Sequence, residues 1–297
     1  MILLKLKLNF KNHLLTLIVF IGFFVYAQNP SRIYKGFKQM NQQIEINTNE
    51  GNYFIKPYNE NIFETSFIPN GEVYNATSHA VSFEPEKMNV SVEDFSSHLL
   101  FSSKGLSVKI EKSPFKIIYY YKGKELISEK LGYQSSLKSF SIDFNLTDNE
   151  VLYGGGARVL GMNRRGNKLQ LYNKAHYGYE TKSELMNYTM PLMLSSKIYA
   201  IHFDNAPIGY LDLDSQKNNT LSYESISGRK TYQVIAADNW YDLMNQYTNL
   251  TGKQPMLPRW ALGNFSSRFG YHSQKEVSET VQKFRNDKIP LDAVIVD

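Results

Sequence analysis

The chain of 297 residues has no cysteine, only two tryptophans and only six histidines. Without cysteine it can form neither disulfides nor thiolate metal sites, and it has no cysteine nucleophile. It contains neither a His-Glu-x-x-His pair nor a Gly-x-Ser-x-Gly segment, so a zinc hydrolase and a serine hydrolase of those types have no support. Lysine and arginine are scattered and the formal net charge is only +5, which disfavours a nucleic-acid-binding surface.

The first 27 residues have the pattern of an export signal. Lys5, Lys7 and Lys11 precede an apolar run over residues 14–26, and Ala27 ends a small-residue cleavage site. The run is about thirteen residues long, whereas a membrane-spanning helix needs about 20. We therefore expect a cleaved signal peptide over residues 1–27 and a periplasmic or secreted protein. An uncleaved membrane anchor is the alternative, and the protein would meet the membrane only through this segment.

Residues 28–254 predict an N-terminal β-sandwich domain. Runs of β-branched and aromatic residues, several alternating with polar ones, return at intervals of about 8–12 residues. Hairpin turns are expected at residues 121–125 and 69–71, where a glycine follows lysine or asparagine. With 21 tyrosines and 18 phenylalanines, most rings are expected in the core, and some could offer faces on which sugars stack. Strands are expected at 44–46, 52–55, 106–110, 115–121, 139–146, 189–194, 198–204, 208–213, 221–226 and 231–236.

A helix over residues 239–250, with one apolar face, is expected to follow the last strand. Gly252 would end it, and Pro255 and Pro258 mark a linker. The domain boundary is therefore placed between residues 254 and 255.

Residues 255–297 predict a strand, a helix and a second strand, the start of a truncated (β/α)8 barrel. The first strand is expected at 260–265, a capping box of Ser273 and Glu276 begins the helix, and the second strand, 293–296, is apolar throughout, as in strands buried on both faces. Asp297 follows it, at the end of the strand where barrels carry their chemistry. A structural cap on a following turn is the alternative for Asp297. One strand–helix–strand cannot close a barrel, so we expect its remainder to lie outside this chain.

Three other motifs lack the residues that their chemistry requires. Residues 153–158 are glycine-rich, but Val159 stands where the dinucleotide fingerprint needs its third glycine. Residues 161–169 approach a phosphate loop without its Lys-Ser/Thr ending. Both runs are interpreted as tight turns between strands. Asp212 and Asp214 have calcium-loop spacing, but neither the glycine nor the closing glutamate follows, so a strand-end turn is expected.

Residues 171–180 mix aromatic, amide and charged side chains between two expected strands. Tyr172, His176 and Tyr179 could stack on a sugar or bond to its hydroxyls, because loops on rigid scaffolds commonly carry binding residues. The alternative is a surface loop whose tyrosines simply pack.

Together these segments resemble glycoside hydrolase family 31, the family of α-glucosidases, α-xylosidases and 4-α-glucosyltransferases. The resemblance covers about residues 30–297 and is most specific over 257–297. It rests on 153–158, 171–179, 188–191 (Tyr-Thr-Met-Pro), 203–205 (Phe-Asp-Asn), 250–252 (Leu-Thr-Gly), 257–263 (Leu-Pro-Arg-Trp-Ala-Leu-Gly), 267–271 (Ser-Arg-Phe-Gly-Tyr) and 289–297.

The resemblance implies a β-sandwich followed by the catalytic barrel, a mostly β chain overall. It implies substrate-binding roles for Asp297, for Arg268 and Phe269, and for the loop of Tyr172, His176 and Tyr179. Many members of the family have an aspartate in that loop, where this chain has Ala175 and His176. The nucleophile and the acid/base, both aspartates, are expected beyond Asp297. The implied substrate is an α-linked gluco-oligosaccharide or related glycoside, and no metal or organic cofactor is implied.

The prediction is therefore an exported enzyme that acts on α-glucosides, by retaining hydrolysis or α-1,4-glucosyl transfer. The chain is expected to be an N-terminal fragment that lacks the catalytic pair and is inactive alone. A non-catalytic carbohydrate-binding sandwich module is the alternative, and a surface-anchored sandwich with no role in sugar binding is a third.

Overall fold

The computed structural model describes residues 31–175, 178, 180, 183 and 186–296. The expected signal peptide, Asp297, His176 and Tyr179 lie outside the described residues. The chain forms two units, one up to Gly252 and one from Lys253 onward. The second unit thus begins two residues before the boundary expected from the sequence.

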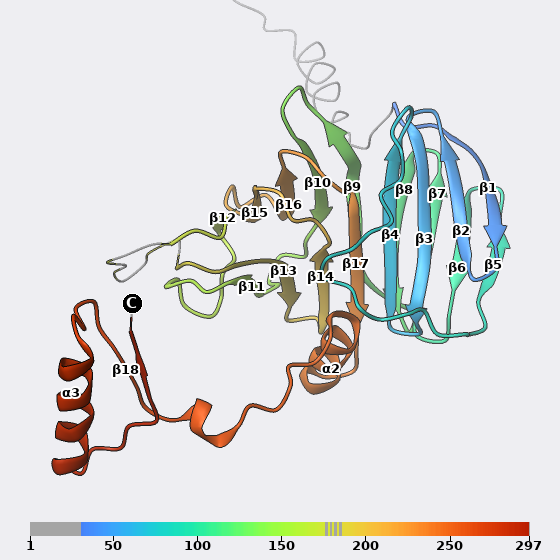
Figure 1. Ribbon diagram of the computed structural model, residues 1–297. Coiled ribbons are helices and arrows are strands. Elements are labelled where there is room, and N and C mark those ends of the chain that lie inside the picture. Colours follow the sequence, from blue (N-terminus) through green and yellow to red (C-terminus); the bar gives the residue numbers. More distant parts are fainter. Residues whose placement is uncertain (1–30, 176–177, 179, 181–182, 184–185, 297) are drawn as a thin grey trace, which may run out of the picture. The chain divides into compact units, whose positions relative to one another are not determined.

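The first unit is a sandwich of two antiparallel sheets that lie face to face (Figure 1). The first sheet has the order β1 (Tyr34–Met40), β2 (Gln43–Thr48), β3 (Gly51–Asn59), β4 (Ile62–Pro69), β17 (Thr231–Ala236), β14 (Tyr199–Phe203), β13 (Thr189–Ser195), β11 (Leu152–Gly156). The second has the order β12 (Asn167–Leu171), β15 (Gly209–Leu213), β16 (Thr220–Ser225), β10 (Phe140–Asn145), β9 (Lys124–Ser135), β8 (Phe115–Tyr121), β7 (Leu106–Lys112), β6 (His98–Ser102), β5 (Ser91–Asp94). The mostly β sandwich and every strand expected in this unit are confirmed.

Alternation along the strands fills the space between the sheets. In β2, Ile44 and Ile46 are fully buried, while their neighbours on the other face remain partly exposed. Aromatic rings occupy much of this core, and Phe203 stacks on Tyr223 with ring centroids 4.3 Å apart. The expected aromatic-filled core is therefore confirmed, while other rings, such as Tyr172 and Tyr241, are exposed.

One carboxylate lies inside this core. Glu129 of β9 is 1% exposed and accepts a hydrogen bond from the Tyr232 hydroxyl at 2.6 Å. Tyr232 in turn contacts the Tyr119 hydroxyl at 2.6 Å. Burial raises the pKa of Glu129 to about 7, against the opposing effects of the Tyr232 hydrogen bond and the Arg32 charge.

The outer face of the first sheet is covered by α2 (Trp240–Thr251) and by residues 75–88. Leu243 and Leu250 of α2 are fully buried against apolar residues of this face, among them Ile235. The Asn239 side chain caps the helix by accepting from the Asp242 amide at 3.0 Å. The predicted helix is confirmed.

Two interpretations of the sandwich sequence are wrong. The glycine run is not a turn but strand β11, which pairs with β13. Glycine is required there because a Cβ on Gly154 would lie 2.2 Å from the Leu192 carbonyl oxygen of the neighbouring strand. The turn at 69–71 ends β4 without forming a hairpin, since β4 pairs with β3 and with the distant β17. The expected turns at 121–125 and after Asp212 are confirmed.

The second unit contains η1 (Arg259–Leu262), β18 (Phe265–Ser267), α3 (Gln274–Asn286) and β19 (Ala293–Ile295). β18 and β19 pair in parallel, so the predicted strand–helix–strand order is confirmed. The strand expected at 260–265 is wrong over its first residues, which form a 3₁₀ turn after Pro258. The expected burial of 293–296 is also wrong, because Ile295 is 46% and Val296 57% exposed and β19 has only β18 as a strand partner among the described residues.

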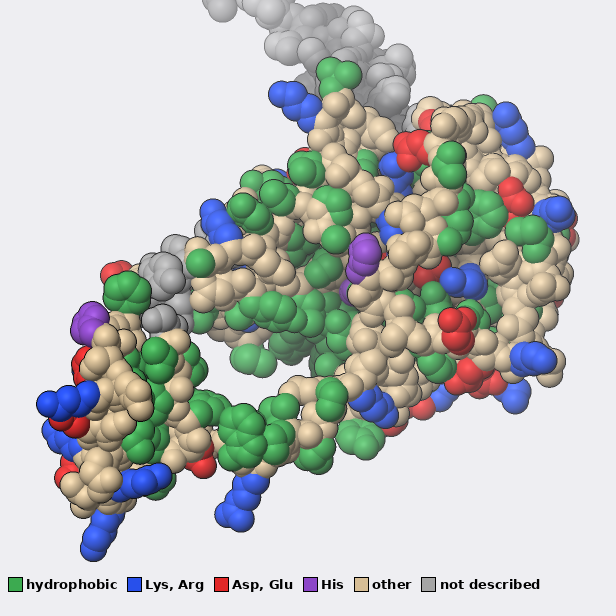
Figure 2. Space-filling view, in the orientation of Figure 1, with side chains coloured by type: hydrophobic (Ala, Val, Ile, Leu, Met, Phe, Trp, Pro, Cys, Tyr) green, Lys and Arg blue, Asp and Glu red, His purple; other side chains and the backbone are tan. Residues whose placement is uncertain are grey.

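Within the described residues, no helix combines the length and the apolar character needed to span a bilayer. On the face shown in Figure 2, Lys and Arg side chains are spread among Asp and Glu instead of forming one basic patch.

Candidate functional site

The loop that carries Tyr172 connects the two sheets at one end of the sandwich. It leaves β12, an edge strand of the second sheet, and enters β13 of the first sheet at Thr189. The Asn173 side-chain oxygen accepts from the Thr189 amide at 2.6 Å and from its hydroxyl at 2.8 Å. These two bonds close the base of the loop next to Tyr172.

Arg158 also links the two sheets, through a hydrogen bond from the end of β11 to β12. It follows β11 directly, is 8% exposed, and donates to the Gly155 carbonyl at 3.1 Å and to the Gln170 carbonyl of β12 at 2.6 Å. Because β11 and β12 are edge strands of different sheets, this guanidinium holds the sheet edges together below the loop. This role was not predicted, because the glycine run was interpreted as a turn. The signal that could have found it is an arginine at the end of a glycine-rich strand.

A hollow of about 420 Å³ lies beside Tyr172, and we call it the rim hollow. The Tyr172 ring is 38% exposed, with the Lys174 ammonium 5.1 Å from its centroid. An exposed ring beside backbone and amide groups can pack on the C–H face of a sugar and bond to its hydroxyls. The lining residues are Leu171, Tyr172, Asn173, Thr189, Pro191, Asn205, Ala206, Pro207 and Ile208.

The second unit presents Phe269 on a short turn after β18. The Arg268 guanidinium donates to the Gly270 carbonyl at 3.0 Å, pairs with Glu276 and lies 4.9 Å from the Tyr271 ring centroid. Arg268 thus braces the turn, while Phe269 is 97% exposed. Glu276 also accepts from the His272 amide at 3.0 Å, and Ser273 caps α3, so the helix start is fixed together with the turn.

The structure places the six candidate residues as follows. Tyr172 lies in the first unit, and Arg268 and Phe269 are neighbours in the second. His176, Tyr179 and Asp297 lie outside the described residues. Among the described residues, no cluster of three or more His, Asp or Glu side chains could hold a metal ion.

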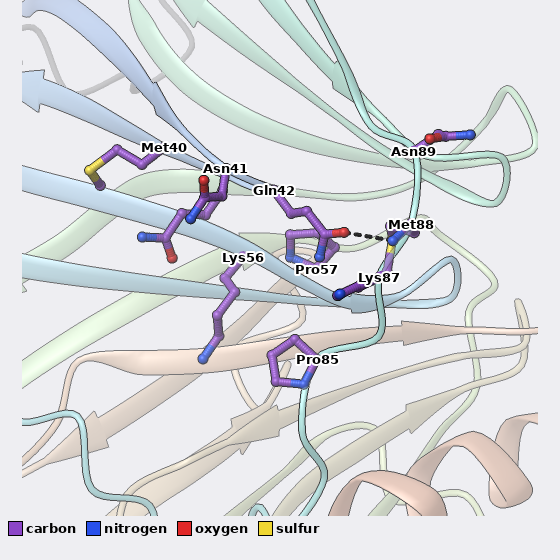
Figure 3. A pocket seen from close by; sticks show the side chains of 10 residues that line it. Met40, Asn41, Gln42, Lys56, Pro57, Pro85, Lys87, Met88 and Asn89 are labelled. Atoms are coloured by element: carbon purple, nitrogen blue, oxygen red, sulfur yellow. Dashed lines mark hydrogen bonds between the residues drawn. The ribbon is translucent and has the colours of Figure 1, made fainter.

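Another hollow, of about 760 Å³, lies at the opposite edge of the first sheet (Figure 3). Gln42, in the β1–β2 turn, holds the segment 86–88 beside it. Its side chain accepts from the Met88 amide at 2.6 Å and donates to the Glu86 carbonyl at 2.8 Å. None of its ten lining residues is aromatic or acidic, so it offers no ring for stacking. It is therefore less suited to a sugar than the rim hollow.

Known protein families match both units. The model of the glycosyl hydrolase 31 N-terminal galactose mutarotase-like domain matches residues 52–212. The model of the glycosyl hydrolases family 31 TIM-barrel domain matches residues 254–297.

Curated relatives and solved structures agree with these matches. Alpha-glucosidase 2 of Bacillus thermoamyloliquefaciens is 30% identical over 82% of this chain and 32% of its own length. The alpha-xylosidase of Saccharolobus solfataricus is 32% identical over 71% of this chain and 30% of its own length. The dextranase of Flavobacterium johnsoniae, solved with isomaltotriose, has the same fold, with a TM-score of 0.83 at 24% identity over 89% of this chain and 33% of that chain. This chain spans about a third of the length of the curated relatives.

Proposed function

The chain belongs to glycoside hydrolase family 31, and on that premise we propose that it forms the N-terminal part of an exported enzyme acting on α-glucosides. The observation that carries the proposal is the Tyr172 loop, which is fixed at its base beside the rim hollow. Curated relatives named alpha-glucosidase and alpha-xylosidase, and a dextranase solved with isomaltotriose, support the class of substrate.

In this proposal, the second unit is the opening of a (β/α)8 barrel, and each unit carries its own candidate sugar contacts. Tyr172, His176 and Tyr179 would contact a sugar from the loop of the first unit, and Phe269 would offer a ring from the second. Arg268 is occupied by Glu276 and Gly270, so we assign it the task of holding Phe269 in place. Asp297 would bond to sugar hydroxyls.

The proposed chemistry uses two carboxylates placed about 5–5.5 Å apart, one as nucleophile and one as acid/base. No residue of this chain is assigned to either role, because in the family both lie on later barrel strands. Hydrolysis and glucosyl transfer share the glycosyl-enzyme intermediate and differ in the acceptor, water or a sugar hydroxyl.

The test compares the full-length protein with this chain on 4-nitrophenyl α-glucoside and on maltose. The full-length protein should release glucose, and the chain alone should give no turnover above background. Substituting Tyr172→Ala in the full-length protein should raise KM, because an aromatic contact to the sugar is lost. A full-length protein inactive on all α-glucosides tested would refute the proposed activity. Turnover by the chain alone would refute the placement of the catalytic pair.

Export is tested separately. Mass spectrometry of protein recovered from the periplasm or medium should give Gln28 as the first residue. Recovery of an intact N-terminus in the membrane fraction would favour the anchor instead.

A further inference from the structure

A row of polar side chains crosses the outer face of the first sheet through four neighbouring strands. Lys56 of β3 faces Glu64 of β4, Glu64 faces Gln233 of β17, and Gln233 faces His202 of β14. The Lys56 ammonium lies 3.1 Å from Glu64, the Gln233 amide donates to Glu64 at 2.8 Å, and Gln233 Oε1 lies 2.8 Å from His202 Nδ1. These contacts converge on the Glu64 carboxylate, with Lys56 on one side and Gln233, which links it to the His202 imidazole, on the other.

This order fixes how the His202 ring is protonated. The Glu64 carboxylate only accepts, so the NH₂ group of Gln233 turns toward Glu64 and its oxygen toward His202. That oxygen also only accepts, so His202 Nδ1 carries the hydrogen. Burial lowers the pKa of His202, against the opposing effect of Asp204, so the ring is neutral and Nε2 bears a lone pair.

Nε2 has no partner among the described residues. His202 is 3% exposed; its Nδ1 contacts Gln233, and its ring packs edge to face with Tyr247, with centroids 6.0 Å apart. The residue lines a hollow of about 500 Å³, which we call the His202 hollow. In the part of the chain that the structure describes, the enclosed side-chain atoms without a partner are the Tyr133 and Tyr223 hydroxyls, so Nε2 keeps access to the hollow and can accept a hydrogen bond from a ligand there.

The charges in the hollow's wall are already paired. The Asp204 carboxylate pairs with Arg229 and accepts from the Ser78 hydroxyl at 2.9 Å, and Arg229 also donates to the Asn75 carbonyl at 3.0 Å. A neutral ligand therefore fits better than an ion. The side chains of Tyr188, which is 50% exposed, and Tyr247 line the same space and supply ring surface.

We propose that the His202 hollow binds a glucose unit of an α-linked oligosaccharide, with a sugar hydroxyl donating to His202 Nε2 and Tyr188 and Tyr247 packing on the sugar. A sugar combines hydroxyl donors, neutrality and an apolar C–H face, which are the three properties that the hollow selects. The choice of glucose rests on the proposed function. The His202 hollow shares Thr189, Pro191 and residues 205–207 with the rim hollow, so one oligosaccharide can span both.

The test is a calorimetric titration of the full chain with maltotriose and with isomaltotriose. The variant His202→Asn keeps an amide donor where Nδ1 faces Gln233 but removes the Nε2 acceptor. It should weaken binding by about tenfold or more, as expected when a buried hydrogen bond is lost. The matched control is His98→Asn, whose Nδ1 also has a partner, the Ser97 hydroxyl at 3.0 Å, but which lies on the second sheet. It should leave the affinity unchanged.

Imidazole ¹⁵N spectra of the unmodified chain give a second measurement that needs no variant. They should show His202 protonated at Nδ1 and a shift of its Nε2 resonance on addition of maltotriose. Absence of binding, an unchanged affinity in His202→Asn, or an Nε2 resonance that does not move would each overturn the proposal. If the full-length protein hydrolyses α-glucosides and this chain binds none, the proposed sugar binding in the His202 hollow is wrong and the proposed function stands. If the chain binds and the full-length protein has no activity, the proposed function is wrong and the binding site stands.

Discussion

The sandwich encloses a large apolar core, whereas the second unit exposes most of its large apolar side chains. Phe63 and Tyr199 of the sandwich are fully buried, while Trp260 is 58% and Phe269 97% exposed. The helix α2 buries two leucines on the sandwich, but α3 has no buried residue at all. The apolar side chains of the second unit are visible as exposed green surface in Figure 2. Stability of the described structure therefore resides in the sandwich, and the second unit supplies surface that can contact something else.

The largest effect should come from a core substitution in the sandwich. The Phe63 ring lies 5.6 Å from the Phe101 ring, centroid to centroid, and is fully enclosed. Phe63→Ala should lower the free energy of unfolding by about 3–5 kcal/mol, because it leaves a cavity in a packed core. Phe269→Ala removes the same kind of ring from an exposed turn and should change the free energy of unfolding by no more than about 0.5 kcal/mol. Urea unfolding followed by circular dichroism measures both, and similar losses would contradict the comparison.

A somewhat smaller effect is expected from the carboxylate in the core. The pKa of Glu129 rises from 4.5 to about 7 on folding, so the folded state binds its proton more tightly. Its contribution to stability is fully present below pH 4.5 and is lost as the pH rises through 7. Between pH 5 and pH 8 this loss should be on the order of 2–3 kcal/mol.

Glu129→Gln stays neutral at every pH and should remove this part of the pH dependence. Urea unfolding at both pH values gives the slope, and the exposed Glu93→Gln is the control that should keep it. An equal slope in Glu129→Gln and the unmodified chain would show that the core carboxylate does not titrate in this range.

Periodicity predicted the strands whose side chains alternate between core and solvent, because burial of one face imposes that pattern on the sequence. In β7, Leu106, Val108 and Ile110 are buried and the residues between them are not, so the sequence of residues 106–110 is enough to predict the strand. The pairing of β4 with β17 has no local signal, since about 160 residues separate them and only the folded sheet brings them together. β11 was missed for the opposite reason, because three glycines give no strand propensity although close strand contact requires them.

The candidate site was predicted less completely than the fold. The sequence pointed to Tyr172 and Phe269 through residue type and family resemblance, and the structure puts Tyr172 beside a hollow and Phe269 on a braced turn. Arg158 and His202 were not predicted, because their roles depend on partners in other strands, and only for Arg158 does the sequence hold a local signal, its place after a glycine-rich strand. A histidine suggests a ligand site only when the structure shows that one ring nitrogen is hydrogen-bonded to the protein and the other is not.

The smallest expected effect compares the two helix caps. Asn239 caps α2, which packs on the sandwich, and Ser273 caps α3, which buries no residue. Asn239→Ala should lower the free energy of unfolding of the sandwich by about 1 kcal/mol, the usual loss for an N-cap. Ser273→Ala removes an equivalent bond, from the Glu276 amide at 3.2 Å, but α3 contributes nothing buried to the sandwich.

Ser273→Ala should therefore leave the main unfolding transition where it is and instead speed amide hydrogen exchange within α3. Exchange measured by mass spectrometry separates the two helices by their peptides. If Ser273→Ala shifted the main transition as much as Asn239→Ala does, the two units would unfold as one cooperative body. The proposed difference in stability between the two units would then be wrong.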